Sequence, residues 1–152
     1  MLPEGPFLVG SVLYNDKAKV AQIVASLLPK GPVWSWENFS ALGVVRRGNL
    51  IGGVIYSNYR PHANDIEITA AFSSPDWCLP DTIKQILAFP IQQLGCTRCT
   101  ARTARRNKPA RQFNERLGFK VEGVQRKAYD GKQDIIIYGL LLDQFDWLKK
   151  VK

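Results

Sequence analysis

A strand–helix–strand run between residues 65 and 105 is the feature that most limits what this chain can fold into. Within Asp65–Ser73, the residues Ile66, Ile68 and Ala70 alternate with Glu67, Thr69 and Ala71, which is the pattern of a half-buried strand. The run continues with Asp81–Leu94, whose apolar residues have helical spacing, and with Arg98–Arg105, a second predicted strand. Two strands joined by a crossover helix usually pair in parallel within one sheet. We therefore expect an α/β protein (of the α+β type) organised around this parallel pair.

Antiparallel strands are predicted on both sides of that unit. The expected hairpins join Ala41–Arg46 to Leu50–Tyr59 and Phe119–Tyr129 to Asp134–Leu142, each through a glycine-containing turn. Asn15–Leu28 has the apolar stripe of an amphipathic helix and ends before Pro29. Together these elements predict one domain over residues 1–152, with a mixed sheet of six or seven strands and helices on both faces.

The composition is that of a folded protein with reduced thiols. The 152 residues are 45% hydrophobic, and no apolar run approaches the ~20 residues that span a bilayer. Of the three cysteines, Cys78, Cys96 and Cys99, only Cys96 and Cys99 form a close pair, and with no second pair and the single His62 a zinc site would have to draw on carboxylates. We therefore predict no metal site, no membrane partner and a cytoplasmic location. Aromatic residues near Trp34 or Trp147 could support a homodimer.

The net charge of +8 indicates an anionic ligand or partner. Arginine is concentrated in the stretch 98–111, which favours nucleic acid as one candidate. On a strand, however, Arg98 and Arg102 face one side and Arg105 the other, so no continuous basic stripe forms. A nucleic-acid partner is therefore the least favoured of the interpretations considered.

The segment that starts at Asn107 carries the strongest motif. Asn107 can cap a helix that has Pro109 in its first turn and ends at Gly118, and Phe119 returns the chain to the sheet. The motif residues are Asn107, Ala110, Leu117-Gly118-Phe119, Glu122-Gly123-Val124, Arg126, Tyr129-Asp130-Gly131 and Tyr138-Gly139. In order and spacing they resemble the GCN5-related N-acetyltransferase superfamily, and within it the ribosomal-protein acetyltransferase branch. The resemblance covers residues 41–142 and implies the acyl-CoA N-acyltransferase fold.

The resemblance also implies a binding place for acetyl-CoA. In that superfamily two central strands splay apart, and the pantetheine arm pairs with the first of them like an added strand. The corresponding residues here are Ala71, Phe72 and Ser73. The pyrophosphate would meet the start of the next helix near Thr82, with Asn107 and Arg111 close by.

The phosphate loop departs from the superfamily pattern. The stretch Cys78–Ile83 lacks the glycines that allow a phosphate to approach the backbone. Pro80 removes a backbone donor, and Asp81 adds a carboxylate where the pyrophosphate would bind. The loop is degenerate, and we expect Asp81 to weaken binding of the cofactor.

Two residues are the sequence candidates for catalysis. Glu67 occupies a strand position where superfamily members often carry a general base, although a solvent-facing carboxylate is the simpler interpretation. Many relatives carry a tyrosine as general acid where this chain has Asn114, which cannot supply a proton. Of the remaining tyrosines, Tyr138 is preferred to Tyr129.

These residues favour an acetyl-CoA-dependent N-acetyltransferase in which an amine attacks the thioester directly. The acceptor could be a protein N-terminus, a lysine or a small amine. The alternative is a non-catalytic relative that has kept the fold and has lost efficient use of acetyl-CoA.

Overall fold

The computed structural model describes residues 4–28 and 36–144. The predictions made for Trp34, Trp147 and the end of the chain beyond residue 144 fall outside those residues. None of the described helices is long and apolar enough to cross a bilayer.

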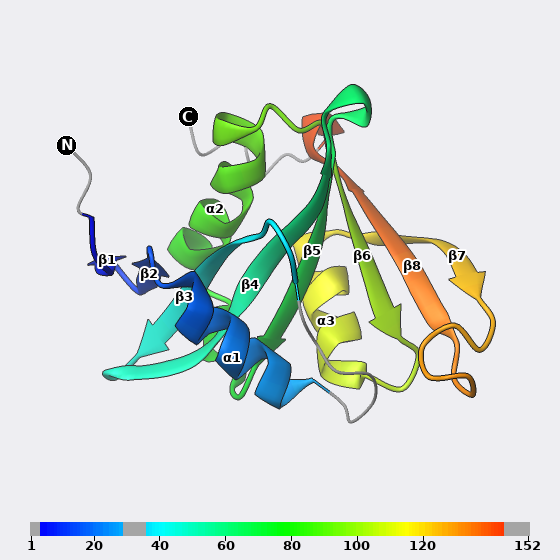
Figure 1. Ribbon diagram of the computed structural model, residues 1–152, viewed down its shortest axis with the longest axis horizontal. Coiled ribbons are helices and arrows are strands. Elements are labelled where there is room, and N and C mark those ends of the chain that lie inside the picture. Colours follow the sequence, from blue (N-terminus) through cyan, green and yellow to red (C-terminus); the bar gives the residue numbers. More distant parts are fainter. Residues whose placement is uncertain (1–3, 29–35, 145–152) are drawn as a thin grey trace.

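One mixed sheet runs through the whole structure (Figure 1). Its strands lie side by side in the order β1-β2-β3-β4-β5-β6-β8-β7. The strands are β1 (Phe7–Val9), β2 (Val12–Tyr14), β3 (Ser40–Arg46), β4 (Asn49–Arg60), β5 (Asp65–Phe72), β6 (Arg98–Ala104), β7 (Lys120–Gln125) and β8 (Ile135–Leu141). The mixed sheet confirms the predicted fold class, with eight strands rather than six or seven. The added strands β1 and β2 have three residues each, too few to show an alternating pattern.

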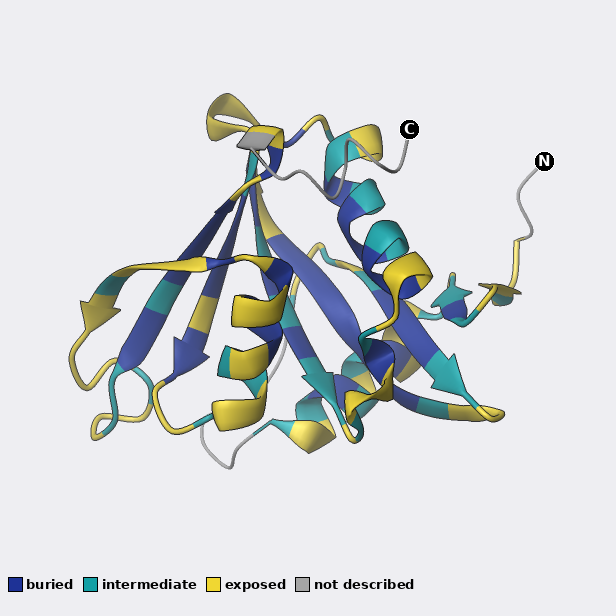
Figure 2. Ribbon diagram, turned by 180° about the vertical axis from the view of Figure 1, so that it is seen from behind, coloured by how far each residue is buried: buried dark blue, intermediate teal, exposed yellow. Residues whose placement is uncertain are grey.

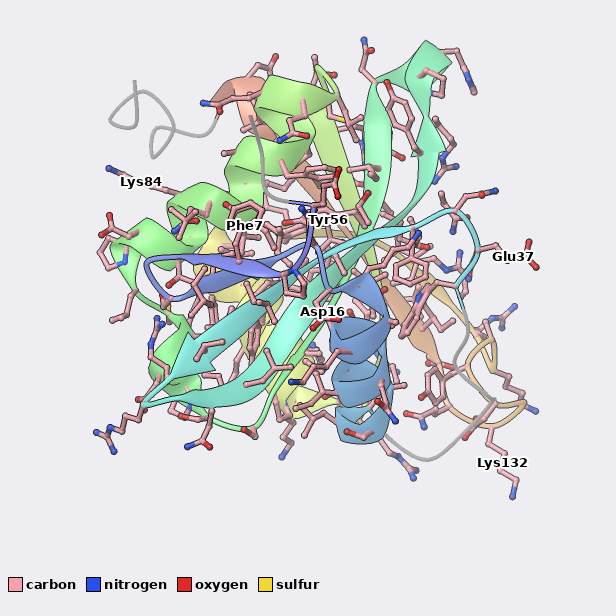
Figure 3. All side chains as sticks on the ribbon, turned by 60° about the vertical axis from the view of Figure 1, so that its left-hand side comes forward. Phe7, Asp16, Glu37, Tyr56, Lys84 and Lys132 are labelled. Carbon is pink, nitrogen blue, oxygen red and sulfur yellow. The ribbon has the colours of Figure 1, made fainter. Side chains whose placement is uncertain are left out.

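Within the described residues, three α-helices pack on the two faces of the sheet. They are α1 (Lys17–Leu27), α2 (Pro80–Ala88) and α3 (Lys108–Leu117). The front face in Figure 1 carries α1 across β3, β4 and β5, and Figure 2 shows α2 and α3 on the opposite face. The larger core lies beneath α2 and α3. There Tyr56 is fully buried and donates a hydrogen bond to the Ile86 carbonyl at 2.6 Å, whereas Lys84 and Lys132 project outward (Figure 3).

The capping residues of α3 act as the sequence predicts. The side chain of Asn107 accepts a hydrogen bond from the Ala110 amide at 3.3 Å, which satisfies a donor at the first turn. At the other end Gly118 has φ +98°, and its amide donates to Asn114 and Glu115 carbonyls. Because Asn107 caps the helix, α3 begins at Lys108, only a few residues after β6 ends at Ala104.

The second predicted helix is shorter than expected. Instead of reaching Leu94, α2 ends at Ala88 and passes into a π-helical turn over Phe89–Gln93. Pro90 lies in that turn, and its ring and missing amide prevent the regular α-helical hydrogen bond. The crossover still delivers the chain to β6.

The parallel pair β5–β6 is present, and it opens part-way along. The paired residues are Asp65 with Arg98, Ile66 with Cys99, and Glu67 with Thr100. Past Glu67 the two strands diverge, and Figure 1 shows β5 and β6 fanning apart toward their arrowheads. On the other side of β6, β8 pairs over Arg98–Ala104 and separates it from β7. The divergence therefore creates a gap within an otherwise continuous sheet.

Candidate active site

A cavity of about 350 Å³ lies where the ends of β5 and β6 have separated. Three of the predicted cofactor residues, Ala71, Phe72 and Ser73, line it from the end of β5. A fourth, Asn107, lines it from the cap of α3. The opposite wall comes from α3 itself, through Pro109, Ala110, Gln112, Phe113 and Arg116. The structure thus brings together four positions that the sequence assigned to one ligand.

Three aromatic rings form the apolar wall of this cavity. Phe72 stacks on Trp77 with ring centroids 5.1 Å apart, and Phe113 lies 4.5 Å from Trp77. Phe72 and Phe113 are 5.5 Å apart, so each ring contacts the other two. Rings packed in this way hold the loop after β5 against α3, which fixes the shape of the cavity.

A narrow space continues from the cavity into the gap between the strands. Ala70, Asn107 and Ala110 border both. The space measures about 20 Å³, enough for roughly one water molecule. Leu28, at the end of α1, and Tyr129 also border it. An acyl arm could therefore enter only when the side chains around the gap move apart.

A third hollow, of about 500 Å³, lies on the front face of the sheet where the gap begins. Its lining residues are Asn58, Tyr59, Arg60, Glu67 and Arg102. Arg102 borders both this hollow and the strand gap. The three spaces share lining residues and so mark a path through the sheet, closed at the gap, from the cavity beside α3 to the hollow at Glu67.

A local irregularity in β4 places a partner beside Glu67. The pairing of β4 with β5 shifts between Ser57 and Arg60, which is a bulge that redirects the side chains next to it. Asn58 Nδ2 donates to Glu67 Oε2 at 2.7 Å. Arg102 Nε lies 3.9 Å from Glu67 Oε1, too far for a hydrogen bond. One carboxylate oxygen is thus held by Asn58, and Oε1 accepts no hydrogen bond among the described residues.

The tyrosine preferred from the sequence does not border this path. Tyr138 is fully buried under α3, and Arg111 Nε donates to its hydroxyl at 3.0 Å. Arg111 also donates to the Arg105 carbonyl, so it braces α3 against β8 and is not among the cavity-lining residues. Tyr138 belongs to the larger core beneath α2 and α3, whereas Glu67 borders the front hollow. The tyrosine that borders the gap is Tyr129.

Thr82 is also placed away from the cavity. It is fully buried, and its hydroxyl accepts a hydrogen bond from Arg46 Nη2 at 2.8 Å and lies 3.1 Å from Ser11 Oγ. The helix start is therefore tied to the turn between β1 and β2 and to the end of β3. Asp81 borders a different hollow, with Gly10 and Lys84. The expected repulsion between Asp81 and a pyrophosphate has no support in this placement.

The loop before α2 uses several of its own backbone donors. The amides of Cys78 and Leu79 donate to the carbonyls of Pro75 and Trp77, and the Asp76 amide donates to Ser74 Oγ. Those amides are not free to cradle a phosphate. Arg116 is the cation that borders the cavity, and it has no hydrogen bond or ion pair with any residue that the structure describes.

Three residues of the site were not assigned to it from the sequence. Asn58 could have been noticed, because asparagine is uncommon inside strands and often marks an irregular backbone. Arg102 drew attention only as part of a basic stretch. Arg116 carries no local signal, since its place on the cavity depends on how α3 packs against β5.

The arrangement of strands is shared with solved acetyltransferase structures. A protein from T. thermophilus to which acetyltransferase activity has been ascribed superposes with a TM-score of 0.71 over 99% of this chain and 96% of its own, at 18% identity. The spermidine/spermine N-acetyltransferase SpeG from Vibrio cholerae superposes with a TM-score of 0.61, over 76% of this chain and 73% of its own, at 19% identity. The chain has the acetyltransferase fold.

Another solved structure shares the fold, whereas comparisons of the sequence alone find no match. A further protein with an ascribed acetyltransferase activity superposes with a TM-score of 0.61 at 22% identity, over 70% of this chain, and this chain spans 63% of its length. No protein-family model and no curated protein matches the chain. At these identities the comparisons establish the fold, and the activity has to be argued from the site.

Proposed function

We propose that this chain is an N-acetyltransferase that uses acetyl-CoA and an amine acceptor. The observation that carries the proposal is the path from the cavity beside α3, through the strand gap, to Glu67. Once the side chains at the gap move apart, such a path would let two substrates approach the same point from opposite faces of the sheet, as direct transfer requires. The superfamily resemblance of the motif from Asn107 to Gly139 supports the same interpretation, including its ribosomal-protein branch.

The end of β5 is suited to the pantetheine arm. Past Glu67, β5 has no partner among the described strands on the side of β6. Its backbone groups there can pair with an extended amide-containing ligand in the manner of an added strand. Ala71, Phe72 and Ser73 would lie along that ligand, with Asn107 facing them from α3. Arg116 would supply the charge for the phosphates in place of loop amides.

Glu67 and Tyr129 are the residues proposed to move protons. Bound acetyl-CoA supplies a thioester, whose carbonyl carbon bonds to the amine nitrogen as the C–S bond breaks. Glu67 Oε1 would accept the proton that the ammonium must lose, directly or through one water. Tyr129, a residue that borders the gap, would return a proton to the sulfur. Tyr138 would instead hold Arg111 and so position α3.

A binding protein without transferase activity is the second candidate. It is favoured by the loop amides that are already bonded and by the gap of about 20 Å³. Both observations weaken the case for a tightly held cofactor. The two candidates differ in whether coenzyme A is released when acetyl-CoA and an amine are supplied together.

The first experiment measures thermal stabilisation of the purified chain by acetyl-CoA, because a ligand of the native state raises Tm. We expect stabilisation by acetyl-CoA, and weakening of its affinity by about tenfold in Arg116→Gln. Asp81→Asn is the matched control, since Asp81 borders a different hollow, and it should behave as the wild type. No stabilisation at millimolar acetyl-CoA would overturn the proposal.

The second experiment measures coenzyme A release with a panel of amines. Glu67→Gln should lower kcat at least tenfold, because the amide cannot accept the proton. Binding of acetyl-CoA should be unchanged in that variant, since Glu67 lies beyond the donor cavity. If acetyl-CoA stabilises the chain but no amine leads to release of coenzyme A, the result would favour a binding protein without transferase activity.

A further inference from the structure

The hollow in front of Glu67 carries both signs of charge. Two guanidinium groups border it with that single carboxylate, and both are accessible: the Arg60 side chain is 52% exposed and that of Arg102 is 42% exposed. The Glu67 side chain is 13% exposed. Because Arg60 pairs with Asp65 at 3.2 Å, the charges that a ligand meets in the hollow are chiefly those of Arg102 and Glu67.

The neighbouring carboxylates are already neutralised. Asp65 pairs with Arg60 and Arg98, each at 3.2 Å, and accepts a hydrogen bond from Thr100 at 2.9 Å. Glu122 pairs with Arg98 at 2.7 Å. Through these short contacts, the charges of Asp65, Glu122 and Arg98 are paired within the protein. Glu67 and Arg102 are the pair that remains loosely joined.

Arg102 is held in place but has hydrogen-bonding capacity left. Its Nη2 donates to Gln125 Oε1 at 2.6 Å, which fixes the guanidinium across the face of β8. A guanidinium has five N–H donors arranged to match a carboxylate. Within the described part of the chain, the bond to Gln125 is the hydrogen bond that Arg102 makes. Its other donors can therefore take a carboxylate from a ligand.

We infer that the acceptor is a free α-amino acid, whose amine meets Glu67 and whose carboxylate is bound by Arg102. This inference rests on the proposed function and narrows its acceptor. The separation of 3.9 Å between Arg102 Nε and Glu67 Oε1 places the two charges side by side. An α-amino acid carries its ammonium and carboxylate on one carbon, so it can pair with both groups at once. A peptide N-terminus lacks that adjacent carboxylate, because it is part of an amide bond.

The same charges disfavour a polyamine. A linear polycation would have to lie beside the Arg102 guanidinium, whose hydrogen bond goes to the neutral Gln125, and like charges at short range repel. SpeG, which shares the fold, is named as a spermidine/spermine N-acetyltransferase. Shared fold does not carry shared acceptor, since specificity depends on the side chains of the site.

Binding of the acceptor can be measured without any donor. Calorimetric titration of the full chain would use the common α-amino acids one at a time, the carboxamide of each binder, spermidine, and a short peptide beginning with the same residue. We expect at least one free amino acid to bind, with its carboxamide at least tenfold weaker. Equal or tighter binding of the carboxamide, the peptide or spermidine would overturn the inference, as would the absence of any amino-acid binding.

Two variants separate the role of Arg102 from general effects. Arg102→Gln should abolish the preference for the free acid over its carboxamide, whereas Arg126→Gln, another exposed arginine, should keep it. A preference that survives in Arg102→Gln would contradict the assignment. Stabilisation by acetyl-CoA, measured on the same samples, tests the proposed function separately. A chain that binds acetyl-CoA but no amino acid refutes this inference alone.

Discussion

Asn58 reaches Glu67 because its backbone is left-handed, with φ at +51°. Asparagine tolerates this conformation better than most residues, and here it turns the side-chain amide toward Glu67 Oε2. A hydrogen bond to a charged group contributes about 1.5–3 kcal/mol. The bond keeps one carboxylate oxygen occupied and orients the other toward the front hollow.

The first prediction follows from this contact. Asn58→Gly keeps the left-handed backbone and removes the amide, so we expect kcat to fall about tenfold with little change in KM for the donor. The matched control is Asn64→Gly. Asn64 has φ +49°, and its side chain makes no hydrogen bond to any residue in 4–28 or 36–144. Equal kcat values for the two variants would remove Asn58 from any role in positioning Glu67.

A second prediction concerns the buried hydroxyl of Thr82. Thr82→Val keeps the shape of the side chain but leaves Arg46 Nη2 and Ser11 Oγ without their shared partner. We expect the free energy of unfolding in urea to fall by about 1–3 kcal/mol. The exposed Thr97 provides the control, because Thr97→Val removes a hydroxyl with no hydrogen bond in the described structure and should change stability little.

The double variant Thr82→Val with Ser11→Ala tests the same network more closely. Removing both hydroxyls leaves fewer unsatisfied groups than removing one, so the two effects should not add. A coupling of about 0.5 kcal/mol or more between the two sites is expected. Strict additivity would show that the contact at 3.1 Å contributes nothing to stability.

The third prediction uses the buried thiol of Cys99. Burial raises the pKa of this thiol well above its ordinary value of 9.0, and it raises the pKa of Tyr56 in the same way. In the unfolded chain the thiol loses its proton near pH 9, while in the folded chain it keeps it. The unfolded state then binds fewer protons. The contribution of this thiol to the free energy of unfolding is therefore fully present below about pH 9 and is lost as the pH rises above it.

Unfolding in urea between about pH 7 and pH 11 measures this effect. Above about pH 9 the wild type should lose up to about 1.4 kcal/mol more per pH unit than Cys99→Ala, in which this group no longer titrates. Cys78→Ala is the control, because Cys78 is only half-buried. Parallel pH profiles for the wild type and Cys99→Ala would contradict the prediction.

The parts of the fold that the sequence predicted are those determined by local chemistry. Asn107 and Gly118 fix the ends of α3 through contacts within a few residues, and the crossover from β5 to β6 follows from the helix between them. The sequence predicts only a bend at Pro90, whereas α-helical hydrogen bonding ends at Ala88. How a helix accommodates a proline depends on what packs around it, which the local sequence does not specify.

The candidate site was harder to predict, because its members are assembled by long-range packing. Ala71, Phe72, Ser73 and Asn107 were placed at the cavity by the resemblance to a known superfamily. Thr82 was assigned through the same resemblance and Tyr138 was preferred among the remaining tyrosines, and both prove to be buried with partners from other elements. A hydroxyl in a sequence does not show whether it meets a ligand or another side chain. Only the register of the sheet and the packing of α3 decide between the two.

The last prediction links Gly52 to the donor cavity. Gly52 has φ +150°, and it pairs with Phe72 across β4 and β5. A Cβ at this position would clash with the Ala71 carbonyl oxygen and lie 2.7 Å from Phe72 Cα, so β5 would have to move. The unfavourable backbone conformation alone costs about 1–3 kcal/mol.

Gly52→Ala should therefore lower both the free energy of unfolding and the affinity for acetyl-CoA. The loss of affinity should be present in folded protein well below its Tm, because the displaced residues Ala71 and Phe72 border the cavity. Gly123→Ala is the matched control in another strand, since a Cβ there meets no atom within 4 Å. If Gly52→Ala were destabilised but bound acetyl-CoA as tightly as Gly123→Ala, the edge of β5 would not be the surface on which the donor lies.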